Sequence, residues 1–89
     1  MTEDRLTVDR LYPTPLWQQL AAVLRQMIES GEIEPRQPLP SESRLEQQYE
    51  VSRGTVRKAL DVLRSDHLVV TITGRGTYVN PRDRWHTGQ

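Results

Sequence analysis

The spacing of apolar side chains changes once along this 89-residue chain, and the change limits the folds it can adopt. Up to about residue 65, apolar residues recur every three or four positions, which is the period of an amphipathic helix. After Asp66 and His67 the pattern becomes two β-branched runs, 68–73 and 77–79, joined by Gly-Arg-Gly. This pattern predicts a β-hairpin that directly follows a helical region.

The first helix is expected to begin near Pro15. Thr14 would be its N-cap, and Pro15 would take the first helical position, where its missing N–H has no consequence. Gly31 would end the helix, because glycine readily adopts the left-handed conformation of a helix C-terminus. The connector that follows, 32–40, contains three prolines and is expected to be irregular.

Two further helices are expected before the hairpin. Ser41 and Ser52 are each placed to accept a hydrogen bond from the first turn of a helix, and a tight turn separates the two helices. The prediction is therefore a mainly α fold with a small β-hairpin, a winged helix-turn-helix of three helices plus a wing. It would span 12–80, between a flexible N-terminal arm at 1–11 and a flexible tail at 81–89.

Composition argues against several classes of protein. The chain has no Cys, which excludes disulfides, a thiolate zinc site and a cysteine nucleophile. Its two histidines, His67 and His86, lack metal-ligand spacing, and neither a nucleophile elbow nor a glycine-rich phosphate loop occurs. No apolar run is long enough for a membrane span or a secretory signal. We therefore expect a cytoplasmic protein that is not an enzyme, with no catalytic residue, no metal site, no cofactor and no membrane partner.

Charge is unevenly distributed along the chain. The formal net charge is zero, with 12 Lys and Arg against 12 Asp and Glu. Residues 1–50 hold five bases and nine acids, a net charge of −4, while residues 51–89 hold seven bases and three acids, a net charge of +4. All the bases but one are Arg, whose guanidinium makes forked contacts with phosphate and guanine. The second half can therefore present a basic face to nucleic acid.

The third expected helix carries bases away from its apolar side. At about 100° per residue, Arg53, Arg57 and Arg64 fall within about 40° of one another, and Lys58 lies further round. This arrangement suits a helix end in a DNA major groove, although a solvated basic face is the alternative. The first turn is small or polar, which would allow close approach: Ser52, Gly54 and Thr55.

The expected hairpin tip could contact the other groove of a duplex. Arg75 lies between Gly74 and Gly76, so one guanidinium could enter a minor groove without steric hindrance. The alternative is an ordinary turn with an exposed arginine.

The start of the second helix could position the protein on phosphates through Ser41, Ser43 and Arg44. For Ser41 a plain N-cap role is the alternative, and the two roles are compatible. Three glutamates that recur every four residues from position 42 are expected to form a solvated acidic stripe.

Several segments resemble, in order and spacing, the DNA-binding domain of the GntR family of bacterial transcription regulators. They are 39–45 (LPSESRL), 51–60 (VSRGTVRKAL) and 74–79 (GRGTYV), and 15–20 (PLWQQL) resembles the family's opening helix. The Gly-Arg-Gly-Thr of the hairpin is most similar to the HutC branch.

The resemblance implies a winged helix-turn-helix that binds an operator as a dimer. It also implies that transcription is usually repressed until a ligand occupies a separate C-terminal domain. Carried over by position, the residues implied in DNA contact come from the recognition helix, the wing tip and the start of the second helix: Arg53, Thr55 and Arg57; Gly74, Arg75 and Gly76; and Ser41.

The chain departs from the family pattern at three positions. Ser43 stands where many members have arginine, and Glu50 and His67 stand in turns that often carry glycine. A positive φ at a residue other than glycine costs about 1 kcal/mol, so these two turns are expected to be strained or differently shaped.

The leading hypothesis is a sequence-specific regulator that binds double-stranded DNA, a repressor on a palindromic operator at the nucleoid. The recognition helix at about 52–65 would enter the major groove, and the wing tip at 74–76 the minor groove. We expect a monomer in solution that forms a homodimer on DNA; an effector ligand would need a further C-terminal domain. The alternative is a winged-helix module that binds another protein, which would not need its arginines to converge.

Overall fold

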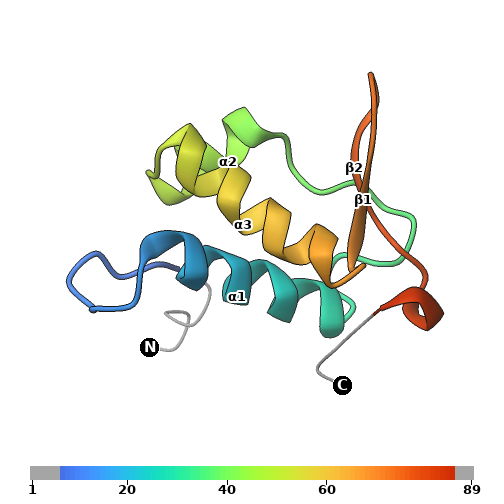
Figure 1. Ribbon diagram of the computed structural model, residues 1–89, viewed down its shortest axis with the longest axis horizontal. Helices are drawn as coiled ribbons and strands as arrows, with labels where there is room; N and C mark the ends of the chain where they lie inside the picture. Colours follow the sequence, from blue (N-terminus) through green and yellow to red (C-terminus); the bar gives the residue numbers. More distant parts are fainter. Residues whose placement is uncertain (1–6, 86–89) are drawn as a thin grey trace.

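The computed structural model describes residues 7–85, which form three helices followed by a hairpin. The elements are α1 (Leu16–Glu29), α2 (Glu42–Tyr49), α3 (Arg53–Ser65), β1 (Val69–Ile72), β2 (Gly76–Val79) and the short 3-10 helix η2 (Arg82–Arg84). In Figure 1, α1 lies below α3, α2 lies above it, and the hairpin stands at one end with its tip free. The predicted winged helix-turn-helix is confirmed.

The core lies between α1 and α3 and is closed by the base of the hairpin. Burying one Leu or Ile side chain contributes about 1.5–3 kcal/mol, so this core fixes which face of α3 points inward. Its most buried members come from all three helices and the hairpin base: Leu20, Leu24 and Ile28; Leu45; Val56, Ala59 and Leu63; Leu68, Val69 and Val79. The opposite face of α3, which carries its bases, is left in solvent.

The prediction for the start of α1 is wrong by one residue. Pro15 is the N-cap and not the first helical residue, and no side chain caps the helix, so Thr14 does not take that role. The carbonyl of Pro15 accepts from the backbone N–H groups of Gln18 and Gln19, at 3.0 and 3.1 Å. The Gln19 side chain also donates to the carbonyls of Thr14 and Asp9. The Gln19 amide therefore ties the preceding loop to the first turn of α1, which no side chain caps.

The two serine caps are confirmed. Ser41 Oγ accepts from the backbone N–H of Arg44, and Ser52 Oγ accepts from that of Thr55, both at 3.1 Å. These caps define where α2 and α3 begin and hold the helix-turn-helix between them.

Both turns that lack the family's glycine adopt a left-handed backbone. Glu50 has φ 55° and His67 has φ 60°. Arg10 donates to the carbonyl of Glu50, and the amide of Asn80 donates to the carbonyl of His67 at 3.0 Å. Side chains from outside the turns therefore help to hold them in a conformation that glycine would adopt freely.

The connector between α1 and α2 pairs with β2. The N–H of Arg36 donates to the carbonyl of Val79 at 2.7 Å, and the N–H of Leu39 donates to that of Thr77 at 2.8 Å. The N–H of Val79 returns a bond to the carbonyl of Gln37 at 2.9 Å. None of the three donors is a proline, so each has an N–H group to give. A segment expected to be irregular therefore lies along the wing.

The described parts of the expected arm and tail make specific contacts. Asp9 exchanges two hydrogen bonds with Gln19. Trp85 packs against the core, its Nε1 donates to the carbonyl of Asn80 at 2.9 Å, and Arg82 stacks on its ring at 4.7 Å. From the sequence, Trp85 could either fold back onto the domain or belong to an interface, and the structure shows that it folds back. Residues 1–6 and 86–89 lie outside the described range, and the boundaries of arm and tail stay predictions.

Candidate nucleic-acid interface

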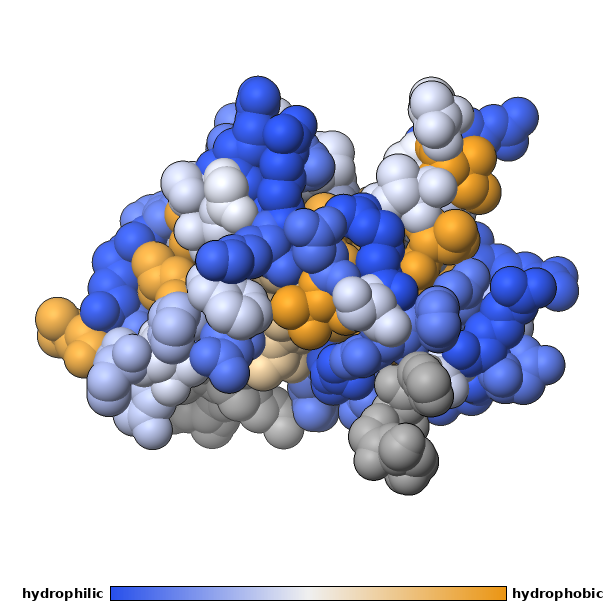
Figure 2. Space-filling model, viewed as in Figure 1, coloured by the Kyte–Doolittle hydropathy of each residue, from blue (hydrophilic) through white to orange (hydrophobic). Residues whose placement is uncertain are grey.

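The hairpin and the start of α2 border an open groove that gathers residues from distant parts of the chain. This wing groove is lined by residues from the start of α2, α3 and the hairpin, among them six of the predicted site residues: Ser41, Ser43, Arg53, Gly74, Arg75 and Gly76. Figure 2 shows the hairpin standing apart from the rest of the molecule, with a notch between them. Arginines from α3 and from the wing thus border one hollow.

The wing tip is shaped by its backbone and by one side-chain hydrogen bond, from the Tyr78 hydroxyl to the carbonyl of Arg75 at 3.4 Å. The strands pair antiparallel from Val69 opposite Val79 to Ile72 opposite Gly76. Gly74 and Gly76 have φ of 81° and 123°, and an added Cβ at either would meet nothing within 4 Å. These glycines are therefore needed for their conformation, and the tip leaves Arg75 exposed.

The first turn of α3 is unobstructed. A Cβ added at Gly54 would meet only Ser52 Oγ, at 3.9 Å. Ser52 Oγ also donates to Thr55 Oγ1 at 3.1 Å, so the polar groups of this turn are held close to the backbone. The helix end can therefore approach another surface closely.

Two recognition-helix arginines are ion-paired with α2. Arg53 Nε lies 3.7 Å from a Glu46 carboxylate oxygen, and Arg57 Nε donates to Glu42 at 3.3 Å. The arginine side chains remain 67% and 59% exposed, so these are surface pairs and not internal ones. The expected solvated acidic stripe is wrong for these two glutamates, because the crossing of α2 and α3 brings them against the arginines.

Arg64 connects α3 to the hairpin and was not among the predicted site residues. Its Nη1 donates to Thr71 Oγ1 at 2.6 Å, and that hydroxyl lies 3.0 Å from Thr77 Oγ1. Arg64 also pairs with Asp61. This network sets how the wing stands on the recognition helix, and no local sequence signal indicates it because it depends on hairpin register.

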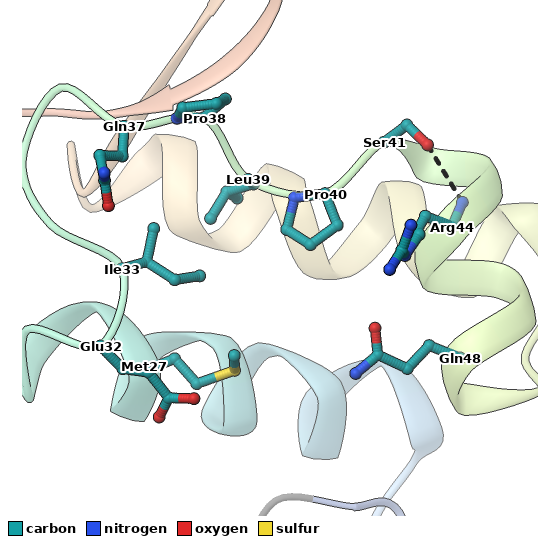
Figure 3. A pocket seen from close by; sticks show the side chains of 10 residues that line it. All are labelled: Met27, Glu32, Ile33, Gln37, Pro38, Leu39, Pro40, Ser41, Arg44 and Gln48. Carbon is teal, nitrogen blue, oxygen red and sulfur yellow. Dashed lines mark hydrogen bonds between the residues drawn. The ribbon is translucent and has the colours of Figure 1, made fainter.

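Six of the predicted site residues are not among those that line the wing groove, and two of these six, Lys58 and Arg44, contact other parts of the fold. Lys58 Nζ lies 5.2 Å from the centre of the Trp17 ring on α1. Arg44 lines a separate pocket between α2 and the connector. In Figure 3, Arg44 and Gln48 lie on one side of this pocket and Met27 lies on the other. Contacts from these bases would therefore be made at the edges of the interface.

Behind this pocket, Tyr49 closes the core. Burial, and to a smaller degree the nearby Glu32 carboxylate, raise the pKa of Tyr49 above its usual value. The ring therefore stays neutral and acts as packing, with its hydroxyl 4.0 Å from Met27 Sδ.

Within residues 7–85, no group of His, Asp and Glu side chains is arranged to hold a metal ion. None of the helices in this range is long and apolar enough to cross a membrane.

The fold, together with the exposed arginines on α3 and at the wing tip, defines a winged helix-turn-helix of the DNA-binding class. Residues 16–79 match the family described as "Bacterial regulatory proteins, gntR family". The chain belongs to the GntR family, which places it among sequence-specific DNA-binding transcription regulators.

Individual relatives agree with this assignment. The chain is 37% identical to the HTH-type transcriptional repressor NagR of Bacillus subtilis, covering 84% of this chain and 31% of NagR. It is 40% identical to a histidine utilization repressor of Pseudomonas aeruginosa, covering 75% of this chain and 27% of that protein, which supports the expected HutC-like branch. The chain thus spans less than a third of the length of these relatives.

A solved structure shares both fold and sequence. The crystal structure of AraR(DBD) in complex with operator ORE1 superposes with a TM-score of 0.74 at 36% identity, covering 81% of this chain and 88% of that chain.

Proposed function

We propose that this chain is the operator-binding domain of a transcriptional repressor. The observation that carries the proposal is the wing groove, which Arg53 of α3 and Arg75 of the wing both border. The operator complex of AraR(DBD) and the repressor relatives support it. Such a regulator would act on the nucleoid in the cytoplasm.

The proposed DNA contacts are divided between the recognition helix α3 and the wing tip. Arg53 and Arg57 would read base edges in the major groove, where a guanidinium can pair with guanine O6 and N7. Arg75 would enter the minor groove. Phosphates would be met by the remaining predicted residues, which lie around these three: Ser41, Ser43, Arg44, Ser52, Thr55 and Lys58, with Gly54, Gly74 and Gly76 allowing close approach.

A winged-helix module that binds another protein is not favoured, because it would not need Arg53 and Arg75 at one groove. The dependence of binding affinity on salt concentration distinguishes DNA binding from protein binding. If DNA is bound through phosphates, the logarithm of the affinity falls with the logarithm of salt concentration by about 0.9 per neutralised phosphate. A flat salt response would contradict DNA binding as the function.

Two copies are proposed to bind a palindromic operator. One domain on one half-site binds weakly, and a second linked or adjacent copy raises the effective concentration. We expect the 89-residue chain to be a monomer in solution and to pair on DNA. Analytical ultracentrifugation that finds a stable dimer without DNA would contradict this. Control by an effector ligand would require a domain beyond this chain.

In-vitro selection of bound duplexes from a random pool tests the proposal directly. We expect an enriched palindromic motif with half-sites about one helical turn apart, or a multiple of that distance. The matched control is the Arg53→Ala variant, which should lose the motif and keep its fold by circular dichroism. A pool that stays random with the parent chain would overturn the proposal.

A further inference from the structure

The start of the helix-turn-helix contains a repeated ion-pair pattern. On α2, Glu42 and Glu46 are four residues apart, and on α3, Arg53 and Arg57 are four residues apart. The geometry joins them crosswise, Glu42 with Arg57 and Glu46 with Arg53. Each glutamate therefore faces one of the two arginines proposed to read bases.

Both pairs use the same edge of the guanidinium. The nitrogen nearest the carboxylate is Nε in each case, at 3.7 Å for Arg53 and 3.3 Å for Arg57. In each pair the contact with the carboxylate is made by Nε, on the side of the guanidinium, and not by a terminal nitrogen. The carboxylates thus hold each side chain from its Nε side.

Stability does not account for these pairs. Exposed ion pairs contribute little to folding, because water and salt weaken them and two long side chains lose freedom. Glu42 and Glu46 are 41% and 30% exposed, and their arginines are more exposed still. Neutral variants of the glutamates should therefore fold, and the consequence of the pairs lies in what the arginines bind.

We propose that Glu42 and Glu46 are positioning residues that direct Arg57 and Arg53 to bases and away from phosphates. A carboxylate beside the guanidinium repels a phosphate that approaches it, and a neutral base edge escapes that repulsion. The effect is to weaken binding to DNA of any sequence while leaving binding to the operator. This inference rests on the proposed function and assigns the specificity of the same surface.

The test compares Glu46→Gln and Glu42→Gln with Glu50→Gln. The control variant removes the same charge at the end of the same helix, where the side chain forms no ion pair among the described residues. Affinity is measured by fluorescence anisotropy for the selected operator duplex and for a scrambled duplex of equal length and composition, over a salt series. Thermal unfolding checks that each variant folds.

We expect each of the two variants to bind scrambled DNA about two- to fivefold more tightly, the range given by exposed ion pairs, with operator binding unchanged or weaker. The salt slope on scrambled DNA should steepen by about 0.9 per variant, as the released arginine takes a phosphate. The Glu50→Gln control should leave both the slope and the ratio of affinities unchanged.

Equal gains on both duplexes, matching those of Glu50→Gln, would overturn the inference, since the glutamates would then act only through net charge. A parent chain that does not distinguish the selected duplex from the scrambled one would instead overturn the proposed function.

Discussion

The recognition helix and the wing each present an arginine beside glycine, but they are supported in opposite ways. The inner face of α3 is fully buried at Val56 and Leu63, whereas β1 is exposed at three of its four residues. A two-stranded hairpin has little stability of its own, and a Cβ added at Gly74 or Gly76 would meet nothing within 4 Å. The helix can therefore hold a fixed geometry toward bases, while the wing can adjust to the width of a groove.

The largest effect should come from the support of α3. Leu63→Ala removes a side chain that is 0% exposed and should destabilise the fold by about 2–5 kcal/mol. Ile72→Ala, in the wing and 45% exposed, should change stability by less than about 0.5 kcal/mol. Urea unfolding measures both, and similar losses would show that the wing belongs to the core.

Next in size is the loss of a base contact. Arg53→Ala and Arg57→Ala should each weaken operator binding by about 1–3 kcal/mol while the unfolding transition stays in place. Titration calorimetry gives the affinity. Two variants that bind like the parent would remove α3 from the interface.

A smaller effect should reveal how the wing depends on its attachment. Arg64→Ala breaks the hydrogen bond to Thr71. Its effect on binding should overlap with that of Arg75→Ala, with a coupling of about 0.5–1 kcal/mol in a double-mutant cycle. The same cycle between Arg64 and Arg53 serves as control and should be additive. Additivity in both cycles would mean that Arg64 does not position the wing.

Gly54→Ala should affect stability and operator binding in opposite directions. The new Cβ has space in the free protein, so the helix should gain up to about 1 kcal/mol from alanine's propensity. Operator binding should nevertheless weaken by about 1 kcal/mol, the size of one disturbed base contact, if the first turn approaches DNA closely. Unchanged binding would mean that the first turn stays clear of the duplex.

Sequence reasoning succeeded where the chemistry is local. Ser41 and Ser52 cap helices through bonds to residues three positions ahead, and Gly74 and Gly76 mark a turn that their own φ angles require. The left-handed backbone at Glu50 was indicated by the family resemblance, in which this turn often carries glycine.

It failed where two elements must be placed relative to each other. The pairing of Glu42 with Arg57 depends on how α2 crosses α3, and the bond from Arg64 to Thr71 depends on hairpin register. The cap expected at Thr14 is absent because the helix begins one residue later, with Pro15 as the N-cap. The contacts that orient the candidate site are thus less predictable than the residues that form it.

The pairing of the connector with β2 has a geometric consequence. The N–H of Leu39 donates to the carbonyl of Thr77. Leu39 lies two residues before Ser41, and Thr77 lies two residues after Arg75. A backbone hydrogen bond therefore connects the segment before α2 to the wing. The distance between the start of α2 and the wing tip is set by the number of residues on either side of this bond. Adding or deleting one residue in this segment would change that distance without altering any side chain proposed to contact DNA, so the length of the segment is itself a constraint on the proposed site.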